Sequence, residues 1–288
     1  MDNLLSIVLE LRALNQPPAP MKAWYGKAAQ AVFLNAVKHA HSSALSARMH
    51  AENHVRAYTA SSLFSDSPLT QHFSADARYY LRYTALDDET AAALRQAVRP
   101  NAPLSPGALV NLVGAKMQIT AVHALPSQHP LAGSESAVRV WNETMQAAGK
   151  LPPSLTIFLH TPTFFKSTQT DSLTPMPSPL LVFSSLSDRW KVYMDLQIPP
   201  QFRQFVQDYV SLVEDDLHLV TLSDGERERC GSVGRLSFVC AKPDSPYWLF
   251  ARILVRFAFY SGIGKETARG FGQAEYIDHY KQSNSRLI

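Results

Sequence analysis

The sequence pattern with the most specific chemistry is a glycine-rich segment near the carboxyl end, SGIGKETARGFGQ. Its glycines follow the spacing G-x-G-x5-G-x-G, and a lysine and an arginine stand between them. The residues that we predict to contact a phosphate group are Gly262, Gly264, Lys265, Arg269, Gly270 and Gly272. Glycine lets backbone N–H groups approach an anion, and the two cations add positive charge. The alternative is a tight helix-to-strand turn that uses glycine for positive φ angles.

Two common phosphate-binding motifs do not fit this segment. A dinucleotide-binding fingerprint needs a third glycine three residues after the second, and that position is Thr267. A Walker A loop needs Ser or Thr after its Gly-Lys pair, whereas Glu266 follows Lys265. The segment therefore does not predict a dinucleotide-binding or Walker-type enzyme.

A second segment, Lys22–Arg56, concentrates histidines and cations. It holds five Lys or Arg residues against one Glu, a net charge of +4, and four histidines. Between Arg252 and Gly272, four cations oppose one Glu, a net charge of +3. The two segments form one basic groove if the fold brings them together, and otherwise they are two solvated helix faces.

Composition limits the class of protein. The chain has 288 residues, of which 46% are hydrophobic and 18% charged, and its net charge is +3. These values predict one or two folded domains. Two cysteines alone cannot hold zinc, and no Cys-x-x-Cys pattern occurs. The apolar start contains Asp2 and Glu10, unlike a secretion signal, and the stretch YWLFARILVRFAFY is shorter than the roughly 20 residues of a membrane span. We expect a cytoplasmic protein with no membrane contact.

Periodicity in the first half predicts a ferredoxin-like order of elements, β-α-β-β-α-β. The predicted strands and helices are a strand at 3–14, an amphipathic helix at 29–40, a short helix at 45–49, strands at 55–64 and 77–85, a helix at 87–98 and a strand or hairpin at 109–123.

The second half predicts another mixed unit after a proline-rich connection. Residues 126–153 form the predicted linker, with a short helix at 136–148. The following predicted elements are strands at 155–160 and 180–185, a helix at 201–213, strands at 217–222 and 233–241, a helix at 246–260 and a strand at 273–277. The predicted domains are residues 1–125 and 154–288.

With three further segments, the glycine loop resembles the CRISPR precursor-RNA-processing endoribonucleases, the sixth Cas protein family. The segments are HTPTFFKS (160–167), PMPSPLLVFSSLSDRWK (175–191) and GSVGRLSFVC (231–240). The resemblance implies an α+β protein of two tandem ferredoxin-like (RRM-like) domains with antiparallel sheets. It also implies a basic cleft for CRISPR repeat RNA and metal-independent cleavage without a cofactor.

The family often has a histidine after its first helix, with a Lys or Arg several residues later. Here the matching positions are His50 and, six residues on, Arg56. The resemblance implies that His50 is the general base or acid and Arg56 the phosphate stabiliser, while His54 is the alternative histidine. Some family members also place a tyrosine in the first helix, and that position is Leu34 here. A Tyr-His-Lys set is therefore not expected.

For RNA contact we predict the loop residues and a set of cations elsewhere. These cations are Lys38, Arg48, Lys166, Arg189, Lys191 and Arg235. Trp190 and Phe271 either stack on a base or belong to the core. The acidic runs 87–89 and 214–216 fit a helix start and a turn better than a metal-dependent nuclease.

The leading hypothesis is an endoribonuclease that cleaves CRISPR repeat RNA in precursor transcripts and releases mature guide RNA. Attack by the 2′-OH group would leave 5′-OH and 2′,3′-cyclic phosphate ends. The alternative is a non-catalytic repeat-RNA-binding subunit of a multi-subunit CRISPR effector complex. A ferredoxin-like metabolic enzyme is a third class, and it would lack salt-sensitive RNA affinity.

Overall fold

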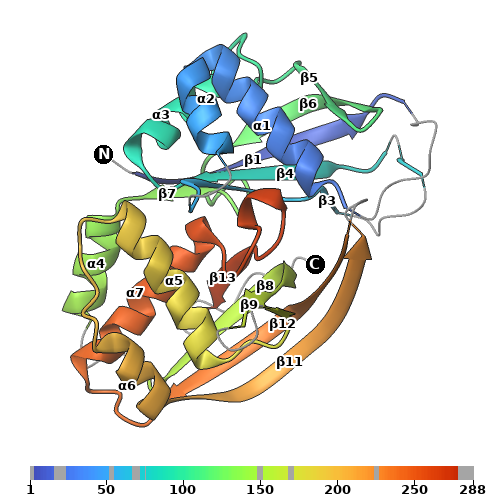
Figure 1. Ribbon diagram of the computed structural model, residues 1–288. Coiled ribbons are helices and arrows are strands. Elements are labelled where there is room, and N and C mark those ends of the chain that lie inside the picture. The colour runs from blue at the N-terminus through green and yellow to red at the C-terminus, as the bar shows by residue number, and fades with distance from the viewer. Residues whose placement is uncertain are drawn as a thin grey trace. The chain divides into compact units, whose positions relative to one another are not determined.

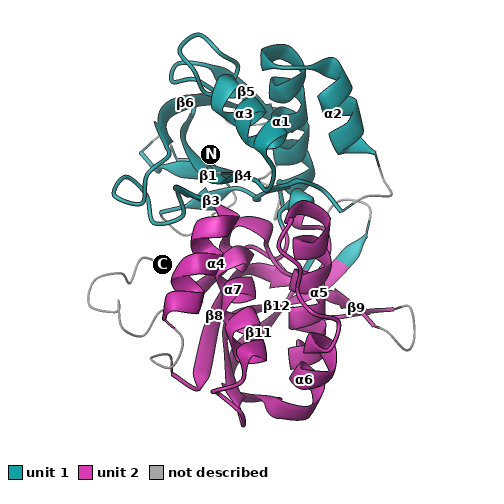
Figure 2. Cartoon of the chain, turned by 90° about the vertical axis from the view of Figure 1, so that its left-hand side faces the viewer, with its two compact units in different colours: residues 1–135, 222–228, 268–270 teal, residues 136–221, 229–267, 271–288 magenta. Residues whose placement is uncertain are grey.

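The computed structural model describes residues 3–15, 24–51, 55–66, 72–74, 76–147, 152–167, 172–223 and 227–277, without the side chains of 214 and 215. His54 lies outside the described residues. The chain divides into two compact units (Figure 2). Unit 1 comprises residues 1–135, 222–228 and 268–270, and unit 2 comprises residues 136–221, 229–267 and 271–288.

Unit 1 is an antiparallel sheet with helices α1–α3 (Figure 1). Its strand order is β2-β4-β1-β6-β5, and the first four strands have the ferredoxin-like arrangement. The elements are β1 (Leu4–Ala13), α1 (Gly26–Ala40), α2 (Ser43–His50), β2 (Tyr58–Ala60), β3 (Phe64–Ser65), β4 (Tyr79–Ala85), α3 (Asp88–Ala97), β5 (Leu109–Leu112), β6 (Ala115–His123) and β7 (Gly133–Glu135).

Unit 2 repeats this plan with the strand order β11-β12-β8-β13. Its elements are α4 (Ala137–Gln146), β8 (Ser154–Thr163), β9 (Phe165–Lys166), β10 (Leu173–Thr174), α5 (Pro179–Tyr193), α6 (Phe202–Tyr209), β11 (Val210–Ser223), β12 (Glu228–Cys240), α7 (Pro246–Ser261) and β13 (Ala274–Ile277). The 3₁₀ turn η1 (Thr267–Arg269) begins in unit 2 and ends in unit 1. The predicted fold class, two ferredoxin-like domains with antiparallel sheets, is confirmed. The change from unit 1 to unit 2 at residue 136 falls inside the predicted linker, 126–153, and the exact domain limits stay a prediction.

Helix periodicity and strand alternation build the core of unit 1. On α1, Ala29, Phe33 and Val37 recur every four residues and are fully buried. On β1, alternate residues from Leu5 to Leu11 belong to the same hydrophobic cluster. Phe33 stacks on Tyr83 of β4 with ring centroids 5.0 Å apart, which joins the helix to the sheet.

One predicted element of unit 2 is wrong, and another ends earlier than predicted. The run at 180–185 is rich in apolar residues and was predicted as a strand, but it lies within helix α5. Ser178 accepts a hydrogen bond from the N–H of Leu181, and Pro179 occupies the first turn, so the helix start is well capped. The helix predicted at 201–213 ends at Tyr209, and strand β11 begins at Val210.

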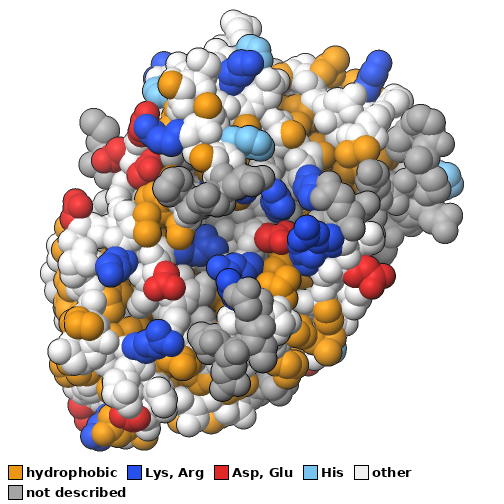
Figure 3. Space-filling view, in the orientation of Figure 1, with side chains coloured by type: hydrophobic (Ala, Val, Ile, Leu, Met, Phe, Trp, Pro, Cys, Tyr) orange, Lys and Arg blue, Asp and Glu red, His pale blue; other side chains and the backbone are white. Residues whose placement is uncertain are grey.

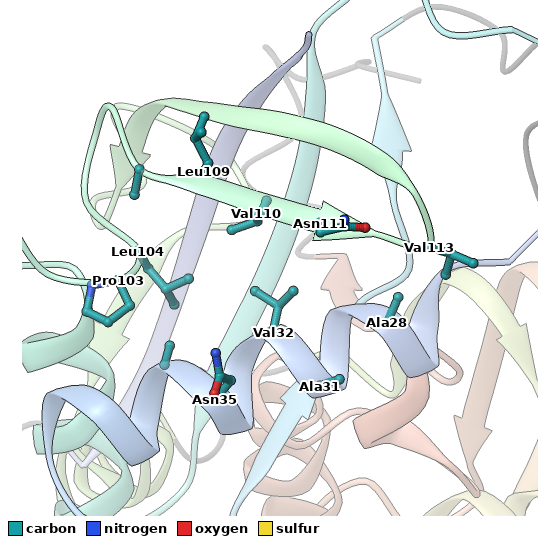
Figure 4. A pocket seen from close by; sticks show the side chains of 12 residues that line it. Ala28, Ala31, Val32, Asn35, Pro103, Leu104, Leu109, Val110, Asn111 and Val113 are labelled. Carbon is teal, nitrogen blue, oxygen red and sulfur yellow. The ribbon is translucent and has the colours of Figure 1, made fainter. Parts of the chain in front are cut away.

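A groove of about 760 Å³ lies between α1 and β5 in unit 1 (Figure 4). Its described lining is apolar except for Asn35 and Asn111, and it includes no titratable side chain. We therefore assign no chemistry to this groove. Within the described residues, no helix combines the length and hydrophobicity that crossing a bilayer requires.

Candidate nucleic-acid interface

The glycine loop is a tight turn whose shape excludes side chains. Its four glycines have φ angles of 63°, 78°, 99° and 66°. A Cβ atom on Gly264 would lie 2.4 Å from the carbonyl oxygen of Phe164, and one on Gly272 would lie 1.9 Å from that of Ile263. Only glycine fits these backbone conformations and approaches. The predicted use of glycine for positive φ is therefore confirmed.

The N–H groups of this turn bond mainly to the protein itself. Gly262 donates to the carbonyl oxygen of Ala258 (2.8 Å), and Gly264 donates to the hydroxyl of Ser185 (2.9 Å). Gly272 donates to the carbonyl oxygen of Pro162 (3.1 Å). These three glycines thus shape the loop, and their amides do not suit the predicted phosphate contact. Of the loop's charged side chains, Lys265 is exposed and Arg269 is half-buried, and their phosphate contact stays a prediction.

Arg189 of α5 supports the loop from beneath. Its guanidinium donates to the carbonyl oxygens of Ser261 (3.3 Å) and Gly264 (2.7 Å) and to the hydroxyl of Thr267 (2.9 Å). Burial lowers the pKa of Arg189 to about 10, so the side chain stays charged at neutral pH. Because this side chain is buried among protein acceptors, its predicted RNA contact is replaced by a bracing role.

An ion pair holds the middle of the loop. Glu266, with a φ angle of 57°, accepts hydrogen bonds through Oε1 from both Nε (3.2 Å) and Nη2 (2.9 Å) of Arg229. Arg229 comes from β12, so the loop is tied to the sheet of unit 2 as well as to α5.

The residues that follow, Ala268–Gly270, belong to unit 1. The indole of Trp24 donates to the carbonyl oxygen of Arg269 (2.9 Å), and Gly270 forms a bridge with Ser61. A Cβ atom on Gly270 would lie 2.7 Å from the Trp24 ring, so glycine is again required. These contacts fix the backbone of Arg269 beside the start of α1.

His50 is the last residue of α2, and it is exposed. The hydroxyl of Ser42 caps α2 at the N–H of Leu45, and the hydroxyl of Ser46 donates to the carbonyl oxygen of Leu34 on α1 (2.8 Å). Met49 is buried, so the helix is anchored on one side and presents His50 on the other. Leu34, at the position where some family members have tyrosine, is buried in the core of unit 1.

A buried hydroxyl connects the candidate catalytic residues. The hydroxyl of Tyr58 accepts a hydrogen bond from the Gln30 amide (2.9 Å) and lies 3.5 Å from the carbonyl oxygen of Met49, the residue before His50. Burial raises the pKa of Tyr58, whereas the charges of Arg56 and Arg269 act to lower it. Both arginines therefore act electrostatically on one hydroxyl, which also lies against the residue before His50.

The remaining predicted cations are spread over both units. Arg48 forms an ion pair with Glu89 of α3. The exposed predicted contacts are Lys38, Lys166, Lys191 and Arg235. On the face shown in Figure 3, basic side chains stand on both units beside acidic ones, so total charge alone does not define a binding surface.

For the other residues with two predicted roles, the structure shows the structural role. Trp190 and Phe271 are almost fully buried, so both are core residues and cannot stack on a base. Asp87 accepts a hydrogen bond from the N–H of Thr90 (2.7 Å) and caps α3, as expected for an acidic helix start.

The fold and the loop place the chain in a structural class, the tandem ferredoxin-like proteins with a glycine-rich turn after the last helix. The sequence model of the family described as CRISPR-associated endoribonuclease Cas6 matches residues 157–274. The family recognised from the sequence is thereby confirmed over these residues. A search of curated proteins found no match.

Solved structures with the same fold cover nearly the whole chain. Cas6 from Thermus thermophilus is 21% identical, with a TM-score of 0.70, over 96% of this chain and 99% of that one. A Cas6 product complex is 21% identical, with a TM-score of 0.74, over 96% and 100%. The product of a Cas6-related gene from Pyrococcus furiosus is 12% identical, with a TM-score of 0.59, over 96% and 99%. At such low identity the likeness establishes the fold and no more.

Proposed function

We propose that this protein is a Cas6-type endoribonuclease that cuts CRISPR repeat RNA within precursor transcripts. The observation that carries the proposal is that the Tyr58 hydroxyl lies 3.5 Å from the carbonyl oxygen of Met49, next to His50, and is influenced by the charges of Arg56 and Arg269. The family match over 157–274 supports the choice of RNA as the substrate. One of the similar structures is a Cas6 variant with a histidine replaced by alanine, which fits a role for histidine in this fold.

RNA carries its own nucleophile, the ribose 2′-OH group. In the proposed reaction His50 removes that proton, or it protonates the 5′-oxygen that leaves, since imidazole ordinarily titrates close to neutral pH. The 2′-oxygen forms a bond to the adjacent phosphorus as the bond to the 5′-oxygen breaks. Solvent water completes the other of the two proton transfers, and the products are a 2′,3′-cyclic phosphate and a 5′-OH. No metal ion takes part in this proposed scheme.

Cations lower the barrier by stabilising the charge that develops on the phosphoryl oxygens. Arg56 is the proposed stabiliser, and Arg269 holds the RNA beside it. Because Trp24 holds the carbonyl oxygen of Arg269 and the next residue, Gly270, forms a bridge with Ser61, the Arg269 side chain starts from a fixed point. Such preorganisation avoids rearrangement during the reaction.

The test is cleavage of the host's repeat RNA in EDTA by the full chain and by His50→Ala. We expect the variant to lose cleavage by at least about a hundredfold, in line with loss of general acid–base catalysis, while RNA affinity stays within about twofold. His41→Ala is the matched control, because His41 is also exposed and contacts Gln96 instead. Cleavage of RNA carrying a 2′-deoxy group at the cut site, or full activity of His50→Ala, would contradict the mechanism.

A further inference from the structure

Two aromatic side chains of the sheet of unit 2 lie on the face that does not pack into the core. On β8, Leu155, Ile157 and Leu159 are fully buried. Strand alternation puts Phe158 and His160 on the opposite face, where both are half-buried. A half-buried phenylalanine in a central strand leaves part of its ring open to a ligand.

The strand register places charges on both sides of Phe158. Arg235 of β12 lies opposite Phe158 on one side, and Glu275 of β13 lies opposite it on the other. Residues paired in this way on antiparallel strands have Cβ atoms about 5 Å apart and point to the same face. The row Arg235–Phe158–Glu275 therefore runs straight across three strands.

Hydrogen bonding and ring contact fix one end of this row. His160 Nε2 lies 3.0 Å from Glu275 Oε2, and the His160 ring packs edge-on against Phe158 with centroids 5.0 Å apart. Arg235 is exposed, and it has no hydrogen-bond or ion-pair partner within the described part of the chain. The row thus combines a fixed acceptor, a flat ring and an available cation.

We propose that this row binds one nucleotide of single-stranded RNA. The base stacks on Phe158, the adjoining phosphate contacts Arg235, and Glu275 accepts a hydrogen bond from an amino or imino group of the base. Ferredoxin-like sheets of the RRM type bind bases through aromatic residues of their central strands, and Phe158 lies in such a strand. Charge complementarity favours RNA over an apolar peptide, which would leave Arg235 unused. The proposal rests on the proposed function only for the choice of RNA.

The test measures the affinity of the full chain for a short fluorescein-labelled single-stranded RNA that contains all four bases. Phe158→Leu keeps an apolar side chain but removes the ring, and we expect a loss of about tenfold in affinity, the size of one stacked base. Phe158→Tyr keeps the ring and should retain affinity. Arg235→Gln should weaken binding and reduce its salt dependence, whereas Arg203→Gln, an exposed arginine on α6, should change neither.

Circular dichroism checks that the variants are folded. Unchanged affinity in folded Phe158→Leu would overturn the proposal, as would equal loss in Phe158→Tyr, because then the ring is not the contact. Should Phe158→Leu fail to fold, ultraviolet crosslinking of the RNA to the native chain decides: a crosslink on the β8 peptide supports the site, and crosslinks only elsewhere reject it. The binding row is judged by RNA affinity alone, whereas the nuclease is judged by cleavage with His50→Ala, so failure of the one and failure of the other are distinguishable.

Discussion

Arg189 shows how one side chain sets the shape of a functional loop. It is buried, and it holds two carbonyl oxygens and a hydroxyl that belong to the end of α7 and the loop. Planar guanidinium suits this task because it presents several donors in a fixed geometry. A cation that sequence reasoning assigns to RNA is thereby used inside the protein.

Replacement of Arg189 by methionine should destabilise the protein by about 3 kcal/mol, because buried acceptors lose their donor. Urea denaturation followed by fluorescence measures this change. Arg189→Lys should rescue less than half of the loss, since an ammonium group cannot reach all three acceptors in the same geometry. Wild-type stability in Arg189→Met would show that the bracing role is wrong.

His129 gives a second prediction at the residue scale, on the sheet of unit 1. Burial and, to a smaller extent, the charges of His123 and Arg82 lower the pKa of His129 to about 4, and Glu10 opposes this shift. Its Nδ1 accepts a hydrogen bond from the N–H of Leu131 (3.1 Å), which suits the neutral ring. An unfolded histidine has a pKa of about 6.5, so the unfolded chain binds the proton first as pH falls.

The contribution of His129 to stability is therefore complete above about pH 6.5 and is lost as pH falls toward about 4. We expect a decrease of about 1–2 kcal/mol over this range, reduced from the full shift because the side chain is partly exposed. His129→Asn keeps an acceptor for Leu131 but does not titrate, so its stability should vary less with pH. Parallel pH profiles for the two proteins would contradict this assignment.

Among the elements, the glycine loop depends on backbone conformation as well as on packing. Gly272→Ala is unfavourable for both reasons, because its φ angle is 66° and the new Cβ atom would lie 1.9 Å from a carbonyl oxygen. Gly107 provides a matched control, because its φ angle is 90° and a Cβ atom there meets nothing within 4 Å. We expect Gly107→Ala to cost about 1 kcal/mol from conformation alone and Gly272→Ala at least about 3 kcal/mol. Thermal unfolding of the two variants tests this difference, and equal costs would show that the close approach relaxes freely.

The sequence predicts the order of elements better than the roles of its cations. Periodicity finds α1 and the strands of unit 1, because burial there follows one face. It misassigns α5, because a short apolar run looks alike in a buried strand and a buried helix, and only the capping Ser178 and Pro179 indicate the helix. The bracing role of Arg189 depends on contacts more than seventy positions away along the chain, which periodicity cannot reveal.

The row around Phe158 is missed from sequence for a related reason. Phe158 lies in a run that reads as a continuous apolar strand, so nothing local separates its face from that of Leu159. Only the pairing of β8 with β12 and β13 shows that Arg235 and Glu275 flank it. A sheet register, unlike a loop motif, has no compact sequence signature.

At the scale of the whole molecule, a net charge of +3 is too small to attract RNA without local concentration. RNA binding should nevertheless fall as salt rises, because each phosphate contact releases a counterion. We expect the slope of log affinity against log salt to decrease by about 0.7 for each contacting cation that is removed from a single-stranded site. Arg269→Gln and Arg235→Gln should each show this decrease, and the double variant should show both. Lys242→Gln is the control, since its ammonium lies 3.9 Å from the Tyr209 ring centroid and is already used within the protein. Affinity that does not depend on salt, or a Lys242→Gln slope that falls as far as that of Arg269→Gln, would mean that the charges placed here do not contact the RNA backbone.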